Sequence, residues 1–211
     1  GKTIGYLLPA SYLATPEKPV IISTASILLQ DQLISKDIPQ LNQILDYPIQ
    51  PTVIKGKGHY IDLQRFYATL SNPMKQKQYR LYQMRLLVWL TQTETGDFGE
   101  LHLTSLNHLF FEEVKHRGVR YLALNQPFYQ EDFLRHLHLK MEQSNFLIVN
   151  HAFLAQETQR EELALPESHL LIIDEAHQFN ETGIHFLGEQ WSNSQVLDFA
   201  RETLRTCNKL A

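Results

Sequence analysis

Two adjacent carboxylates, Asp174 and Glu175, come directly after an apolar run in the stretch LLIIDEAHQFNETG at residues 170–183. A buried carboxylate is costly unless it is paired or binds a metal ion, so acids that end a buried run need a partner. If the run is a strand, the acids lie at its carboxyl end, where open α/β sheets bind ligands. Asp174 is then placed to hold Mg²⁺ and Glu175 to orient an attacking water. The alternative is an acid pair that caps the following helix at its positive end.

A second candidate site opens the chain, where Gly1, Lys2 and Thr3 match the last three positions of the phosphate-binding loop G-x-x-x-x-G-K-[ST]. In that loop the lysine reaches the β- and γ-phosphates, and the hydroxyl coordinates Mg²⁺. Three residues are a weak match, and a chain end without ordered structure is the alternative. Combined with Asp174, they predict an ATP site in which Thr3 and Asp174 share one Mg²⁺ and Gly1 and Lys2 hold the phosphates.

Three nearly all-apolar runs must position these residues, namely VIISTASILL (20–29), FLIVN (146–150) and LLIID (170–174). Continuous rather than alternating hydrophobicity is typical of parallel strands that are covered on both faces. Helical patterns accompany the runs, over Thr3–Ala14 with a kink at Pro9, over Leu28–Ile34 and over Ala152–Leu163. The sequence therefore predicts an α/β fold in which a parallel sheet is flanked by helices.

About half of the chain lies between the first two runs and has a different, helical pattern. Residues 75–90 place Tyr79, Tyr82, Leu86 and Leu90 at helical spacing, and residues 91–100 form a polar loop with two glycines. We therefore predict an α/β frame from residues 1–54 and 141–185, and a helical insertion from residues 55–140. A further helical segment occupies 186–211.

The insertion carries an excess of positive charge near its start. Residues 55–90 hold seven basic side chains and one acid, Asp62, in a chain whose net charge is −4. Aromatic residues are interleaved with them, an arrangement that suits single-stranded nucleic acid. In the glycine-rich segment KGKGHY and just after it, Lys55, Lys57, Tyr60 and Arg65 are the predicted contacts. The alternative is a solvated basic helix face with aromatics turned inward, and Tyr79 and Tyr82 favour this alternative.

The residues DEAH at 174–177, preceded by apolar residues, resemble motif II of superfamily 2 helicases. More closely, NFLIVNHAFLAQ (145–156) followed by LLIIDEAHQFNE resembles the DinG-type, XPD-like DNA helicases. GKTIGYLLPA is similar to the family's phosphate loop, and KPVIISTASILLQDQLISKDIPQL (18–41) to its motif Ia. IKGKGHYIDLQRF (54–66) is similar to the start of its iron–sulfur insertion.

This resemblance implies a RecA-like first motor lobe, the partial ATPase lobe of a P-loop NTPase. It implies that Ser23 and Thr24 contact a DNA backbone phosphate, and that His177 couples motif II to a second motor lobe across the nucleotide. The implied cofactors are ATP and Mg²⁺, and the implied partner is single-stranded or forked DNA. A non-unwinding, nucleotide-sensing DNA-binding module of an exonuclease-fused relative is the alternative.

The sequence departs from the family where its iron–sulfur ligands are expected. Asp62 and Gln126 stand at two positions where cluster-bearing relatives have cysteine, and the chain has a single cysteine, Cys207. Because such a cluster normally needs four thiolates, the chain is predicted to lack one and to hold its insertion by core packing.

The remaining composition excludes several classes of protein. No apolar run approaches the roughly 20 residues that span a bilayer, and one cysteine allows no internal disulfide. We therefore expect no membrane association and a cytoplasmic location. The ten histidines show no zinc-binding spacing, and His151 is expected to fix a strand-to-helix turn.

Overall fold

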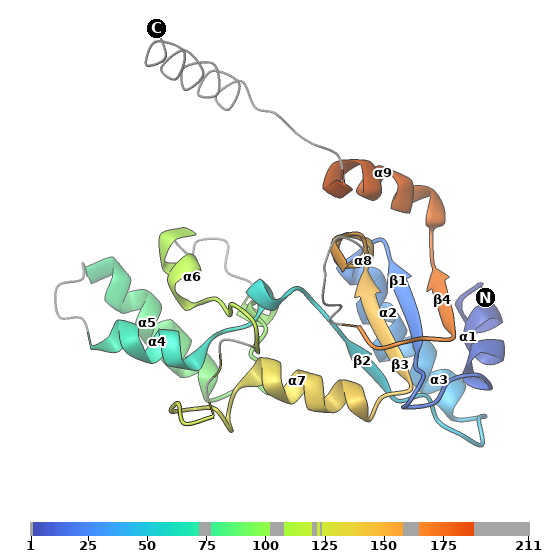
Figure 1. Cartoon of the computed structure of the whole chain (residues 1–211), viewed down its shortest axis with the longest axis horizontal. Coiled ribbons are helices and arrows are strands. Elements are labelled where there is room, and N and C mark those ends of the chain that lie inside the picture. The colour runs from blue at the N-terminus through green and yellow to red at the C-terminus, as the bar shows by residue number, and fades with distance from the viewer. Residues whose placement is uncertain are drawn as a thin grey trace, which may run out of the picture.

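A sheet of four parallel strands forms the centre of the α/β frame (Figure 1). The computed structural model describes residues 2–71, 77–101, 108–119, 122, 124–157 and 165–187. The strands are β1 (Val20–Thr24), β2 (Pro51–Val53), β3 (Phe146–Asn150) and β4 (Leu170–Ile173), in the order β2-β3-β1-β4. Val20 is in register with Phe146 on one side and Leu170 on the other, so the three strands end at one edge. The predicted α/β fold with a parallel sheet flanked by helices is confirmed.

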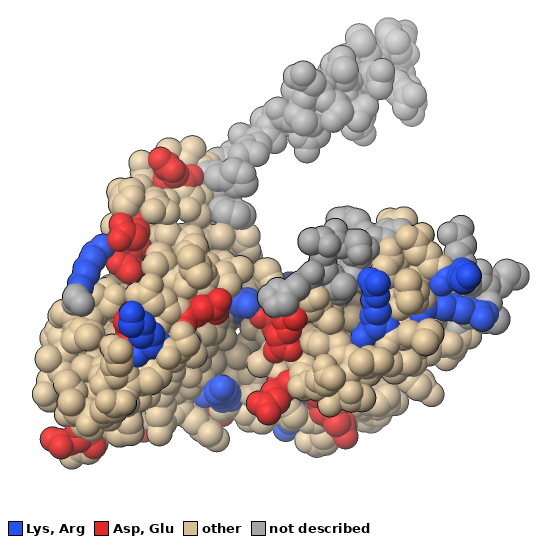
Figure 2. Space-filling model, turned by 180° about the vertical axis from the view of Figure 1, so that it is seen from behind, with Lys and Arg blue, Asp and Glu red and all other residues tan. Residues whose placement is uncertain are grey.

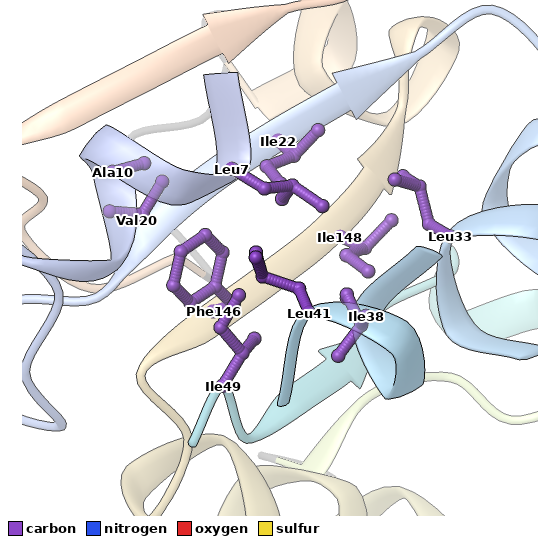
Figure 3. Packing of buried hydrophobic residues seen from close by; sticks show 10 residues of the cluster. All are labelled: Leu7, Ala10, Val20, Ile22, Leu33, Ile38, Leu41, Ile49, Phe146 and Ile148. Carbon is purple, nitrogen blue, oxygen red and sulfur yellow. The ribbon is translucent and has the colours of Figure 1, made fainter. Parts of the chain in front are cut away.

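Helices cover both faces of the inner strands β1 and β3, which explains why these strands are apolar throughout, whereas the edge strand β4 is only partly covered and its Leu171 is 46% exposed. On one face lie α1 (Lys2–Ser11), α2 (Ile27–Gln32), a π-helical turn (Leu33–Asp37) and α3 (Ile38–Asn42). Figure 3 shows Leu7, Leu33 and Leu41 from this layer packed against Ile22 and Ile148 of the strands. On the other face, α8 (His151–Glu157) and Phe179 of α9 (Ala176–Leu187) pack against Ile21 and Val149.

Several boundaries differ from the predicted ones for local reasons. The first strand ends at Thr24 because the Ser26 hydroxyl accepts a hydrogen bond from the Leu29 amide and starts α2. Strand β2 was not predicted, because three residues are too short to show a pattern. α8 ends at Glu157, and the rest of the predicted helix, residues 158–163, lies outside the described residues.

The insertion has a hydrophobic core of its own, and it is rich in aromatic side chains. Its helices are α4 (Leu63–Leu70), α5 (Lys77–Leu90), α6 (His108–Val114) and α7 (Phe133–Glu142), with short 3₁₀ turns at Lys57–His59 and Phe98–Leu101. Phe110 meets Tyr79 edge-on at 4.7 Å between ring centroids, and Trp89 stacks on Phe98 at 5.6 Å. Two such ring pairs, each preferring a specific geometry, fix how the insertion helices pack.

Helix α7 belongs to both cores. Phe133, at its start, packs against the insertion core, whereas Leu137 and Met141 pack against the sheet. The transition between insertion and frame therefore lies within this helix.

No helix in the described ranges is long and apolar enough to cross a membrane. Gly1 and residues 188–211, which include most of the predicted last segment and Cys207, lie outside the described residues.

Candidate nucleotide site at the carboxyl edge of the sheet

Lys2, at the start of α1, contacts both acids that follow β4. Its Nζ lies 2.7 Å from Oε1 of Glu175 and 3.3 Å from Oδ1 of Asp174. Leu7 and Ala10, buried in the core one and two turns further along α1, anchor the helix against the sheet. Two segments 172 residues apart (174 minus 2) therefore meet at the edge where β1, β3 and β4 end.

Asp174 is held in place from several directions. Its backbone amide donates to the Ser23 carbonyl of β1 at 2.9 Å, and its Oδ1 accepts from the Glu175 amide at 3.0 Å. The Tyr6 hydroxyl donates to Oδ2 at 3.4 Å. Burial first, and then the charge of Asp174, raise the pKa of Tyr6, while a side-chain hydrogen bond with Thr3 acts in the opposite direction. Tyr6 thus links the first turns of α1 to the acid at the end of β4.

Glu175 adopts a backbone conformation that is unusual for a residue with a side chain. Its φ is +53°, in the left-handed region. Such strain persists only where the surroundings determine it, and it clusters at functional sites. Hydrogen bonding from Lys2 lowers the pKa of Glu175, and Glu175, followed by Asp174, raises the pKa of Lys2. The acid is therefore ionised and directed towards the start of α1.

His177 lies on the exposed side of the same turn. Its Nδ1 is 3.4 Å from Oε2 of Glu175, and its side chain is 71% exposed. It is thus adjacent to the candidate site and accessible to another part of a longer protein.

The donor groups at this edge suit Mg²⁺ only in company with a nucleotide. Magnesium in proteins usually takes one or two carboxylates together with phosphate oxygens and water. Asp174, after the end of β4, and Thr3, on the first turn of α1, offer one carboxylate and one hydroxyl. Across the described residues, no group of three or more His, Cys, Asp or Glu is placed to hold a metal ion. The residues fit a shared Mg–phosphate site rather than a protein-only metal site.

Tyr6 is a site residue that sequence reasoning missed. It follows Thr3 by three positions, which is nearly one helical turn, so the two side chains share a face of α1. That spacing was the signal that could have found it.

Ser23 and Thr24 lie at the end of β1 as predicted, but both side chains are fully buried. The Ser23 hydroxyl lies 2.7 Å from Nδ1 of His151, and the Thr24 hydroxyl donates to the Ser26 carbonyl at 3.2 Å. Neither hydroxyl faces solvent, because helices cover both faces of β1 up to its last residue. Their contact with a DNA phosphate stays a prediction.

Three of the four insertion residues predicted to contact nucleic acid make structural contacts instead. Lys55 forms an ion pair with Asp97, and the Tyr60 ring is buried, with its hydroxyl accepting from the Lys55 amide at 3.3 Å. Arg65 donates to the carbonyls of Glu112 and Lys115 at the end of α6. These three residues therefore hold parts of the insertion together. Among the four, only Lys57 has an exposed side chain.

Other basic residues of the insertion do face solvent. Lys77, Arg80 and Arg85 are exposed on α5, whereas Tyr82 and Trp89 of the same helix are buried. Figure 2 shows Lys and Arg side chains gathered on the insertion, at the end away from the frame. The alternative of a basic helix face with aromatics turned inward describes α5.

At the two positions that depart from the cysteine pattern, the structure shows ordinary polar contacts. Asp62 caps α4 by accepting from the Arg65 amide at 2.9 Å, and the Gln126 carbonyl accepts from the Tyr129 amide. Nearby, the buried His116 lies 3.0 Å from Asp132, which also caps α7. Helix caps and this buried pair stabilise the insertion together with its aromatic core.

Comparison with known proteins finds relatives of the DinG type, which the motifs of the sequence also resemble. No family model matches it. It is 37% identical over 191 residues to the 3'-5' exonuclease DinG of Bacillus subtilis, an alignment that covers 90% of this chain and 20% of that protein. It is 32% identical over 208 residues to the ATP-dependent DNA helicase YoaA of Escherichia coli, covering 96% of this chain and 32% of that protein. The 3'-5' exonuclease DinG of Staphylococcus epidermidis is 30% identical over 197 residues, 93% of this chain and 21% of that protein.

The chain thus spans between a fifth and a third of the length of these relatives. Over at least nine-tenths of its own length, the chain is a DinG-like segment, similar to part of these DinG and YoaA proteins.

Proposed function

We propose that the chain is the ATP-binding first motor lobe of a DNA helicase, which in the longer protein couples ATP hydrolysis to movement along single-stranded DNA. One observation carries this proposal, the position of the Lys2 ammonium 2.7 Å from Glu175 and 3.3 Å from Asp174. A phosphate-loop lysine beside an acid pair at a strand end is the arrangement that phosphoryl transfer requires.

Each residue at the edge has a proposed role. Lys2 and Gly1 hold the phosphates, and Lys2 exchanges its two carboxylate partners for phosphate oxygens when a nucleotide binds. Thr3 and Asp174 hold Mg²⁺, which neutralises charge on the transferred phosphoryl group. Glu175, which is ionised in the free site beside Lys2, is released when Lys2 moves to the phosphates, and it then orients the attacking water and accepts a proton from it.

The exposed position of the site supports a dependence on a second lobe. The Lys2 side chain is 67% exposed, and His177 is 71% exposed beside Glu175. Motors of this kind complete the site with an arginine from another lobe, which stabilises the transition-state charge. We expect the 211-residue chain alone to hydrolyse ATP negligibly, and His177 to contact the second lobe. Robust turnover by this chain that Lys2→Ala abolishes would contradict that expectation.

Single-stranded or forked DNA is the proposed partner. Lys57 and the exposed basic residues of α5 provide positive charge on the insertion. The relative YoaA is named as an ATP-dependent DNA helicase, which supports the same partner.

The test compares Glu175→Gln with a matched control, Glu181→Gln, in the longer protein. Glu181 is an exposed acid on α9, six residues further along. Glu175→Gln should lower DNA-stimulated ATP hydrolysis by about 10²–10⁴-fold while Mg·ATP still binds. Glu181→Gln should hydrolyse ATP like the wild type. Equal activity of the two variants would refute the proposed role of Glu175.

The names of the DinG relatives support a second candidate. They are 3'-5' exonucleases by name, and the most similar of those quoted is 37% identical to this chain. The chain would then be a nucleotide-sensing, DNA-binding module of an exonuclease-fused protein. Strand separation by the longer protein in the presence of ATP would favour the motor. Nucleotide-dependent DNA binding without strand separation would favour the module.

A further inference from the structure

The exposed face of α5 carries a stripe of aliphatic side chains. Leu81, Met84, Leu87 and Val88 are 47%, 62%, 44% and 60% exposed. Met84 lies three positions after Leu81, and Leu87 and Val88 lie three and four positions after Met84, so the four side chains share one face of the helix. Single exposed apolar residues are ordinary on a protein surface, whereas a contiguous group of them marks an interaction site. These four residues are called the aliphatic stripe below.

The opposite face of α5 fixes the helix in the insertion core. Tyr82, Leu86 and Trp89 are buried there, and the Tyr82 ring lies 5.6 Å from the ring of Phe110 between centroids. Burial of these three side chains sets the rotation of α5 about its own axis. The aliphatic stripe therefore stays on the surface of the folded chain unless another molecule covers it.

Three cations accompany the aliphatic stripe, and α5 contains no acid in any of its 14 positions. Lys77 and Arg80 precede Leu81 and Met84 by four positions, and Arg85 follows Leu81 by four, so each cation lies one helical turn from an aliphatic side chain. Within the described part of the chain, no acid forms an ion pair with any of the three. A partner of complementary charge would place carboxylates beside its own apolar side chains.

The chemistry of this face favours a protein helix over nucleic acid. Single-stranded DNA binds where bases stack on aromatic rings beside cations. In α5, however, Tyr82 and Trp89 are buried and Tyr79 is only partly exposed. Aliphatic side chains at helical spacing pack instead against the side chains of another helix.

The position of α5 indicates that the partner is a separate protein. Figure 1 places α5 on the side of the insertion away from the sheet, and Figure 2 shows the Lys and Arg side chains gathered at that end. A second motor lobe would bind at the carboxyl edge of the sheet, beside Lys2 and His177. The face of α5 therefore lies away from the surface that the rest of the motor would cover.

We propose that this face of α5 is a docking surface for an acidic amphipathic helix of another protein. The apolar side chains of that helix pack on the aliphatic stripe, and its carboxylates pair with the three cations. The inference goes beyond the proposed function, which requires DNA and a second lobe but no other protein. It holds or fails whether or not the chain hydrolyses ATP.

The binding test uses the longer protein and a synthetic, fluorescently labelled peptide of about 15 residues, close to the 14 of α5. The peptide carries leucines at spacings of three and four and glutamates on both flanks, and its control has the same composition in scrambled order. Fluorescence anisotropy should show binding of the peptide and about tenfold weaker binding of the scrambled control. Leu81→Ala should weaken binding by about 5- to 10-fold, whereas Leu139→Ala, at a leucine of α7 that is 41% exposed, should leave it unchanged.

Charge reversal tests the second half of the proposal. Arg80→Glu should weaken binding of the acidic peptide by about tenfold and strengthen binding of a version with lysines in place of the glutamates. Lys18→Glu, at an exposed lysine outside the insertion, should change neither. All four substituted positions are exposed, so the variants should unfold at the wild-type midpoint, which separates lost binding from lost structure.

Three results would overturn the proposal. The first is no binding of the peptide at about 1 mM. The second is equal binding by Leu81→Ala and Leu139→Ala. The third is weaker binding of a single-stranded oligonucleotide to Arg80→Glu while the peptide is indifferent to Leu81→Ala, which would make the face a DNA-binding surface.

A cross-linking experiment in cells tests the natural partner. A photo-crosslinking amino acid in place of Met84 in the longer protein should join it to a segment of another protein that is acidic and has apolar residues at spacings of three and four. The same amino acid in place of Leu139 is the control. A product with DNA, a product within the same polypeptide, or no product above the control would contradict the docking surface.

Discussion

The sequence predicts ligand contacts from charged residues both at the carboxyl edge of the sheet and at the basic start of the insertion. In the structure, the two regions use these charged residues in different ways. At the sheet edge, Lys2, Asp174 and Glu175 meet where solvent and a ligand can reach them. In the insertion, Lys55 is paired with Asp97, and Arg65 is bonded to backbone carbonyls. Among the basic residues described at the start of the insertion, these two make contacts within the protein and four others are exposed, so a local excess of charge does not by itself separate the two uses.

The largest expected effect tests whether the two regions fold as separate cores. Leu86 of α5 is fully buried in the insertion core, and its neighbour Leu87 is 44% exposed. Leu86→Ala should lower the free energy of unfolding of the insertion by about 2–5 kcal/mol, and Leu87→Ala by no more than about 0.5 kcal/mol. Hydrogen exchange of β1 and β3 amides should stay near the wild-type rate in both variants. Equal loss of protection in the sheet and the insertion would show one cooperative unit and would break the comparison.

A glycine in the insertion gives the next largest effect. Gly96 has φ +65°, and a Cβ there would lie 2.3 Å from Cγ of Phe133. Gly96→Ala should therefore destabilise the chain by about 1–3 kcal/mol, from strain and from displacement of Phe133. Gly183 of α9 is the matched control, since a Cβ added to it meets no atom within 4 Å. Gly183→Ala should stabilise by about 0.5–1 kcal/mol, because alanine favours a helix. Thermal unfolding of both variants measures the contrast.

Two lysines of the glycine-rich segment sharpen the comparison within the insertion itself. Lys57 is exposed, whereas Lys55 is paired with Asp97. If Lys57 contacts a DNA phosphate in the longer protein, Lys57→Ala should reduce the slope of log affinity against log salt by about 1. Lys55→Ala should leave that slope unchanged and lower the unfolding midpoint instead. A lower salt slope in Lys55→Ala, with none in Lys57→Ala, would mean that Lys55 leaves Asp97 to bind DNA.

The smallest effect is a titration at the sheet edge. Lys2 lowers the pKa of Glu175, so the pair's contribution is present above the ordinary pKa of a glutamate and is lost as the pH falls through the lowered value. Lys2→Ala should move the pKa of Glu175 back up, which ¹³C titration of its carboxylate measures. Lys18→Ala, at an exposed lysine outside this site, should leave that pKa in place. An unchanged Glu175 pKa in Lys2→Ala would mean that the two groups do not pair in solution.

The fold and the acid pair could be predicted from the sequence because parallel strands impose their geometry. The apolar runs before Asp174 and around Ser23 are both strands, and their carboxyl ends share an edge because the strands are parallel. The directions of individual side chains could not be predicted in the same way. Whether Ser23 faces solvent depends on α8 packing over it, and Tyr60 is buried where its backbone pairs with Asp97, which is distant in the sequence. The orientation of Tyr6 towards Asp174 likewise requires α1 to lie against β4.

The two ends of helix α7 pack into different cores, with Phe133 against the core of the insertion and Met141 in the core beside the sheet. It runs into β3 after a short turn, and β3 ends at the residue before His151. A displacement of the insertion would therefore be passed along the backbone into β3, which pairs with β1 over its whole length. Since β1 in turn pairs with β4, the insertion is joined through two strands to the edge of the sheet at which the acid pair lies.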